Sequence, residues 1–171
     1  SGFAIFSYLF KGTVEENLKM AKPDATKEEM EAVLQKVNLL GFLQTQDGLQ
    51  TQLLEKASNL SGGQCQRLVI ARALLRTDSA VYIFDEAASN IDVESEELIM
   101  NVIHELAKTK TVLLISHRLA NVVKSDKIYF LKDGEIKESG KHDELMSQNG
   151  AYRHLYESQM ALENYGKGGM A

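Results

Sequence analysis

This sequence has one cysteine, only short apolar runs and no excess of basic residues. Its single cysteine, Cys65, cannot form an internal disulfide, so nothing points to an oxidising compartment. Apolar runs such as residues 112–115 are far shorter than the roughly 20 residues that a membrane-spanning helix needs. The 19 basic residues are outnumbered by 24 acidic ones, for a net charge of −5, which disfavours nucleic acid as the main partner. We expect a cytosolic protein that does not itself cross a membrane.

Proline is equally rare, and no linker or internal repeat divides the chain. Pro23 is the only proline among 171 residues, of which 44% are hydrophobic and 25% charged, a balance typical of one globular domain. After Pro23, Thr26 and Glu29 form a capping-box pattern. Apolar residues follow at helical spacing and predict one helix that continues to Gly41.

The middle of the chain predicts a βαβ unit. Residues 64–76 have helical periodicity, and residues 81–84 and 111–115 are short apolar runs typical of buried strands. A helix between the two strands implies parallel pairing with a right-handed crossover. Because both strands then end at the same edge of the sheet, Asp85, Glu86 and His117 are expected to converge there.

The C-terminal third predicts a hairpin followed by helix. Asp133 and Gly134 are a strong turn signal between strands expected over residues 127–131 and 135–138. Residues 143–164 are expected to be helical, ahead of a loose glycine-rich tail.

Two glycines and a hydroxyl stand at the start of the second predicted helix. Ser61, Gly62, Gly63 and Gln64 place backbone amides and the positive end of a helix dipole where an anion such as phosphate binds. A tight turn with a serine cap explains the same residues without any ligand.

Two adjacent carboxylates end the first strand of the βαβ unit, and a histidine follows the second. Asp85 is placed to support Mg²⁺, and Glu86 to orient or deprotonate an attacking water. His117 is placed to donate to a phosphate or its water. Each residue taken alone is also compatible with an ordinary solvated loop.

Four stretches together resemble, in order and spacing, the signature motif, Walker B motif, D-loop and H-loop of ATP-binding cassette (ABC) ATPases. Residues 9–18 and 133–145 resemble segments of ABC exporters, and the resemblance extends over residues 9–156. The four stretches are residues 60–67 (LSGGQCQR), 83–87 (IFDEA), 89–92 (SNID) and 116–118 (SHR).

The resemblance implies that ATP and Mg²⁺ are the cofactors. Asp85 would support Mg²⁺, Glu86 would polarise the hydrolytic water, and His117 would bind the γ-phosphate, all in their own cassette. The serine, two glycines and glutamine of residues 61–64 would contact ATP held mainly by a second nucleotide-binding domain. Asp92 would cross that homo- or heterodimer interface.

The same resemblance implies a transmembrane domain as partner and a location at the cytoplasmic face of the cell membrane. Glu55 stands where related exporters carry an acidic loop that touches the membrane domain. No nucleic-acid partner is expected.

Two elements that ABC ATPases require are missing from the sequence. It has no G-x-x-x-x-G-K-S/T phosphate loop, and no glutamine precedes Gln35, although the Q-loop glutamine would fall near Ile5. We therefore expect the C-terminal portion of a cassette that does not bind ATP alone. Uncovered apolar surface, and oligomerisation to cover it, are further expectations.

The expected fold is α/β, a partial P-loop NTPase-type parallel sheet with an α-helical signature subdomain. The helical subdomain would occupy residues 1–80, the C-terminal part of the ATPase core residues 81–165, and a flexible tail residues 166–171.

The leading hypothesis is the ATPase domain of an ABC transporter that couples ATP hydrolysis to transport. A soluble ABC-type ATPase of DNA repair or translation is one alternative, and a non-catalytic binding module is another. The acidic balance and residues 12–18 disfavour the soluble ATPase, whereas measured ATP affinity would test the binding module.

Overall fold

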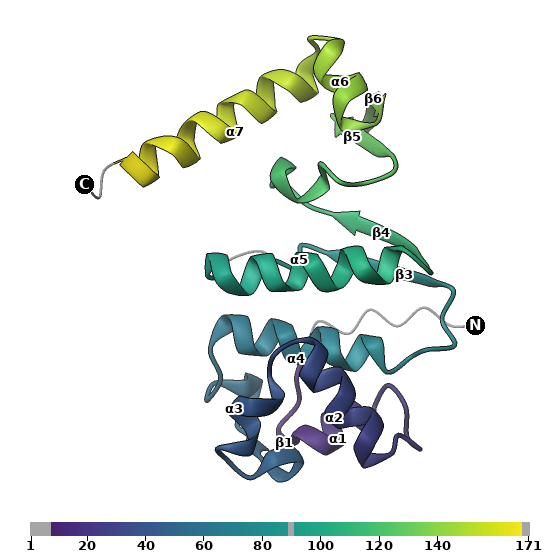
Figure 1. Cartoon of the computed structure of the whole chain (residues 1–171), viewed down its shortest axis with the longest axis vertical. Coiled ribbons are helices and arrows are strands. Elements are labelled where there is room, and N and C mark those ends of the chain that lie inside the picture. The colour runs from purple at the N-terminus through teal and green to yellow at the C-terminus, as the bar shows by residue number, and fades with distance from the viewer. Residues whose placement is uncertain (1–7, 89–90, 169–171) are drawn as a thin grey trace. The chain divides into compact units, whose positions relative to one another are not determined.

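In a computed structural model, the chain forms two compact units, Ser1–Ile115 and Ser116–Ala171 (Figure 1). The structure describes residues 8–88 and 91–168, with side chains up to residue 163. The first unit contains β1 (Gly12–Thr13), α1 (Val14–Lys19), α2 (Lys27–Lys36), α3 (Leu40–Gln44), η1 (Gly48–Gln50), β2 (Gln52–Leu53), η2 (Glu55–Ala57), α4 (Gly62–Leu74), β3 (Val81–Asp85), α5 (Val93–Ala107) and β4 (Thr111–Ile115). The second unit contains η3 (Leu119–Val122), β5 (Ile128–Lys132), β6 (Glu135–Gly140), α6 (His142–Ser147) and α7 (Ala151–Gly168).

The predicted capping box at the start of α2 is confirmed, but the helix ends sooner than predicted. Thr26 Oγ1 accepts from Glu29 N at 3.2 Å, and Glu29 Oε2 accepts from Thr26 N at 3.0 Å. The predicted continuation to Gly41 is wrong, because Asn38 adopts a left-handed conformation with φ 50°. Asparagine tolerates this conformation better than most residues, and the turn separates α2 from α3.

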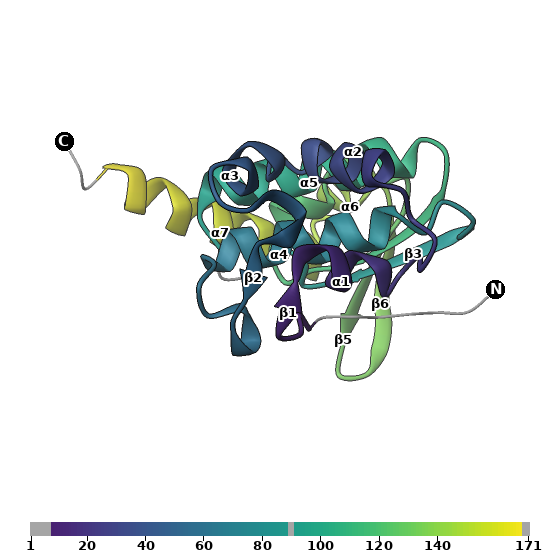
Figure 2. The same ribbon diagram turned by 90° about the horizontal axis from the view of Figure 1, so that it is seen from below.

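Helix α4 packs against α1, α2 and α5, and these contacts build the core of the first unit (Figure 2). The predicted helix over residues 64–76 corresponds to α4, displaced by two residues. The fully buried apolar side chains of this core include Leu18, Met30, Leu34, Leu43, Leu68, Ile70, Ile99 and Ile103.

Strands β3 and β4 pair in parallel, from Val81 opposite Thr111 to Asp85 opposite Ile115, which confirms the βαβ unit. One face of the pair is buried, because Tyr82 and Phe84 join the same core as α5. Both strands are predicted from the sequence to be buried. This prediction is wrong for the opposite face of the β3–β4 pair, where Leu113 and Ile115 are 49% and 45% exposed. Alternation along a strand places these side chains opposite to the helices, so the expected uncovered apolar surface is present.

The predicted hairpin of the second unit is confirmed. Asp133 and Gly134 have φ of 53° and 76°, the left-handed pair that a type I′ turn requires, and they join the antiparallel strands β5 and β6. Each strand extends one or two residues beyond the predicted end.

The stretch predicted to be helical over residues 143–164 consists of two helices. Asn149 is left-handed with φ 53° and separates α6 from α7. The carboxylate of Glu138, on β6, then accepts from Ala151 N at 2.5 Å and stabilises the exposed amides at the start of α7. Because the group that caps α7 belongs to β6, helical periodicity within residues 143–164 does not reveal the break between α6 and α7.

Among the described residues, no helix has the length and apolar character that spanning a membrane requires. The functional boundary expected between residues 80 and 81 stays a prediction.

The buried Tyr152 makes the second unit sensitive to alkaline pH. Burial, together with the nearby Tyr156, raises the pKa of Tyr152 to about 12. A folded-state pKa above the unfolded value stabilises the fold below the unfolded pKa of about 10, and this stabilisation is lost as pH rises toward 12.

We therefore expect the free energy of unfolding to fall between pH 10 and 12 more steeply in the wild type than in Tyr152→Phe. Chemical denaturation at a series of pH values measures this difference. Since Phe cannot ionise, equal slopes in the two proteins would contradict the assignment.

Candidate functional site

Helix α4 begins with a complete capping box at the predicted anion site. Ser61 Oγ accepts from Gln64 N at 3.2 Å, and Gln64 Oε1 accepts from Ser61 N at 2.9 Å. The first intrahelical bond runs from Cys65 N to Ser61 O, so the amides of Gly62 and Gly63 precede the helical ladder. The serine cap and the potential anion site therefore coexist in the same four residues.

The start of α4 lies directly against the start of α5. A Cβ atom on the buried Gly63 would stand 2.4 Å from Ser95 Oγ and 3.0 Å from Asp92 Oδ2. Only glycine permits this approach without displacement of Ser95. The structure thus brings Asp92 together with the signature segment, a contact that the sequence did not predict within one cassette.

Asp92 caps α5 and carries its charge into this contact. Its Oδ1 accepts from Ser95 N at 2.8 Å. Hydrogen bonds from the backbone amide and hydroxyl of Ser95 lower the pKa of Asp92, and the nearby charge of Arg67 lowers it further. Asp92 is therefore an anion at neutral pH, beside the positive end of the α4 dipole.

The two adjacent acids lie where parallel strands β3 and β4 end together. Asp85 is the last residue of β3 and is exposed, and Glu86 N donates to Ile115 O at 2.9 Å. Glu86 has φ of 51°, a conformation that non-glycine residues seldom adopt and that concentrates at functional sites. The left-handed residue turns the chain immediately after the strand.

His117 belongs to the second unit, so its expected convergence with Asp85 and Glu86 stays a prediction. Its side chain is exposed, and Ser116 Oγ accepts from Arg118 N at 3.0 Å in a tight turn around it. The D-loop residues Ser89 and Asn90, like the Q-loop position near Ile5, lie outside the described residues.

The carboxylate of Asp85 fits a magnesium ion that protein side chains bind only in part. Within the described parts of the chain, no three metal-ligating side chains form a cluster. Mg²⁺ is usually bound through one or two carboxylates, several waters and substrate phosphates. Asp85 offers one carboxylate to such a donor set, in which waters and nucleotide phosphates would supply the remaining oxygens.

Comparison with known proteins identifies the family. A model of the family described as "ABC transporter" matches residues 5–89. A protein of Haemophilus influenzae named as an ABC transporter ATP-binding protein is 53% identical over 92% of this chain. The chain belongs to the ABC transporter family. Its resemblance to the nucleotide-binding domains of ABC exporters is therefore confirmed, as is the α/β fold class.

Relatives and a solved structure agree on the exporter type. An ATP-dependent lipid A-core flippase of Mannheimia succiniciproducens is 44% identical over 89% of the chain. A bacterial Atm1-family ABC exporter with ATP bound has a TM-score of 0.81 and 30% identity, over 89% of this chain and 27% of that one. The chain spans about a quarter of the length of these relatives, 28% and 26% of the two proteins named above.

Two residues at these sites were missed in the sequence. Ser95, which meets both Gly63 and Asp92, looks like an ordinary residue in the first turn of a helix. Gln159, which binds the backbone on both sides of Arg118, is 40 or more positions away from its partners. A serine three residues after an N-cap aspartate, as Ser95 is after Asp92, could have indicated the cap contact. No pattern in the residues around Gln159 indicates its distant partners.

The contact at Gly63 predicts a steric penalty that depends on Ser95. Gly63→Ala should lower the free energy of unfolding by about 1–3 kcal/mol, because the new methyl group overlaps Ser95. Adding Ser95→Gly should reduce that penalty, which a double-mutant cycle in urea measures as a coupling energy.

Gly41→Ala is the matched control, since Gly41 lies in α3 with nothing near its Cβ position. Alanine should there stabilise the helix by about 0.5–1 kcal/mol. A Gly63→Ala protein as stable as the wild type would contradict the close approach of α4 and α5.

Proposed function

We propose that this chain supplies the signature, Walker B, D-loop and H-loop residues of an ATP-hydrolysing domain in an ABC exporter. ATP with Mg²⁺ is the cofactor, and hydrolysis drives a transmembrane domain. A phosphate-binding loop, which this sequence does not contain, would complete each nucleotide site.

The observation that carries this proposal is the geometry of Glu86. The residue follows a strand end fixed by parallel pairing, and its amide is anchored to Ile115 O. A left-handed backbone at this position is unfavourable by about 1–3 kcal/mol. It supports a role in which the direction of one carboxylate matters, such as orienting a water for attack on a phosphate.

The three site residues of this cassette divide the chemistry. When bound, Mg²⁺ would neutralise charge on the β- and γ-phosphates. Asp85 would hold the ion, Glu86 would orient the attacking water and accept its proton, and His117 would donate a hydrogen bond to the γ-phosphate.

The residues at the start of α4 would serve a different nucleotide, bound mainly by a second cassette. Gly62 and Gly63 offer backbone amides, and Ser61 offers a hydroxyl, to an incoming γ-phosphate. Asp92 lies against this segment and would connect it with the partner site. We therefore propose a homo- or heterodimer of cassettes with two shared sites.

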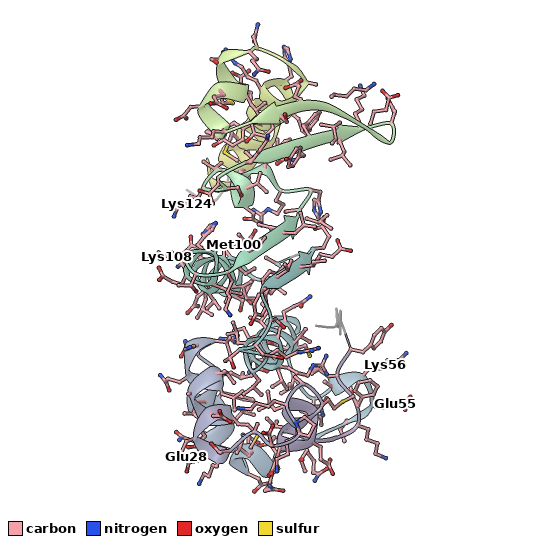
Figure 3. All side chains as sticks on the ribbon, turned by 90° about the vertical axis from the view of Figure 1, so that its right-hand side faces the viewer. Glu28, Glu55, Lys56, Met100, Lys108 and Lys124 are labelled. Atoms are coloured by element: carbon pink, nitrogen blue, oxygen red, sulfur yellow. The ribbon has the colours of Figure 1, made fainter. Side chains whose placement is uncertain are left out.

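The exporter assignment supports a location of the domain at the cytoplasmic face of the membrane. The names of the flippase and exporter relatives support a membrane partner. Glu55 and Lys56 extend into solvent from η2 in Figure 3, next to Leu54, which is 52% exposed. We propose that this projecting turn, in which Lys56 has φ of 55°, touches the transmembrane domain.

Replacing Glu86 tests this function. In the complete transporter, Glu86→Gln should lower the rate of ATP hydrolysis by about 100-fold or more, because an amide cannot accept the water's proton. ATP binding should persist, since the change leaves the phosphate-binding groups intact. Phosphate release and equilibrium nucleotide binding measure the two properties separately.

Glu94→Gln, an exposed acid in the first turn of α5, is the matched control and should hydrolyse ATP at the wild-type rate. Unchanged hydrolysis in Glu86→Gln would refute the assigned role.

A further inference from the structure

Through one side chain, the long helix α7 holds the backbone on both sides of Arg118, the residue that follows the H-loop histidine. Gln159 Nε2 donates to His117 O at 2.8 Å, and Leu119 N donates to Gln159 Oε1 at 2.9 Å. A single amide group therefore satisfies both a carbonyl and an N–H two residues apart. The arrangement uses the donor and the acceptor of glutamine at once.

A second contact from the same helix face reinforces this attachment. Arg118 Nη2 donates to Glu163 Oε1 at 2.9 Å, with both side chains partly shielded from solvent. Gln159 and Glu163 are four residues apart and so lie one above the other on α7. The helix also packs against η3, which begins at Leu119. Three consecutive residues, 117 to 119, are thus tied to α7.

Ser116, which precedes these residues, also contacts the backbone of Arg118 through its side chain. Ser116 Oγ accepts from Arg118 N at 3.0 Å, and its hydroxyl lies 3.3 Å from Arg118 O. The peptide that carries the exposed imidazole therefore lies between a local turn and a helix about forty residues away in sequence. Its backbone is fixed while its side chain remains accessible.

We propose that Gln159 is a positioning residue for His117, so that α7 sets where the imidazole meets the γ-phosphate. This inference rests on the proposed function, because it assigns His117 a phosphate. A displacement of about 1 Å in a catalytic group can lower a rate by as much as about 100-fold, so loss of the bridge should act on hydrolysis rather than on fold.

The chemistry of the bridge separates this role from simple packing. Gln159→Met keeps the length and apolar contacts of the side chain but removes both hydrogen bonds. Gln159→Glu keeps the acceptor for Leu119 N and places a carboxylate oxygen against the His117 carbonyl. If Gln159 served only to pack α7, Met would be the milder change for every property.

The experiment compares these variants in the complete transporter with Ser158→Ala, whose exposed hydroxyl donates to His154 O of its own helix. We expect Gln159→Met and Gln159→Glu each to lower kcat for ATP about 5- to 20-fold, with KM within about twofold of the wild type. Amide hydrogen exchange at Leu119 should accelerate in Gln159→Met, while Ser158→Ala matches the wild type in all three measurements.

The outcomes distinguish this inference from the proposed function. A wild-type transporter that hydrolyses ATP, together with a Gln159→Met variant of unchanged kcat, overturns only the role of Gln159. Loss of kcat that is matched in Ser158→Ala, or explained by a fall in melting temperature, also overturns it. A wild-type transporter that does not hydrolyse ATP overturns both the role of Gln159 and the proposed function. This holds even if amide exchange at Leu119 is slow and so confirms the hydrogen bonds of Gln159.

Discussion

The close approach of α4 and α5 at Gly63 is the constraint on which the arrangement of the first unit depends. Because Ser95 and Asp92 occupy the space where a side chain at Gly63 would lie, the two helix starts cannot separate or slide without loss of the contact. Helix α5 is also the crossover between β3 and β4. The signature segment is therefore tied, through one helix, to the strands that end at the two acids.

The contact at Gly63 links the roles that we propose for the start of α4 and for Asp92. Asp92 is held anionic by Ser95 and by the charge of Arg67, next to the backbone amides at the start of α4. A change at one of these positions would reach the other through direct contact. For the two shared nucleotide sites that we propose, this contact would provide one physical connection within each cassette.

Signals carried by neighbouring residues predicted much of this fold. The Thr26–Glu29 capping box and the Asp133–Gly134 turn each complete their interactions within four residues, and the structure confirms both. The breaks at Asn38 and Asn149 were missed, because helical periodicity continues through them while the backbone becomes left-handed.

The sequence proposes the residues of the candidate site but does not predict their geometry. Motif order suggests Ser61, Glu86 and Asp92 as site residues, yet the left-handed backbone of Glu86 and the contact at Gly63 depend on elements brought together by folding. The exposed face of β4 illustrates the same limit, since an apolar run does not reveal which face is covered. Contacts such as the Gln159 bridge join distant residues and leave no local pattern.

We propose above that Ser61 and Gly63 bind a γ-phosphate held by another cassette. A structure of the complete transporter with Mg²⁺ and a non-hydrolysable ATP analogue tests it most directly. We predict that Ser61 Oγ and Gly63 N lie within hydrogen-bonding distance of the γ-phosphate of the nucleotide bound to the partner cassette. An ATP-bound structure in which these atoms face solvent, or contact the nucleotide of their own cassette, would contradict the account.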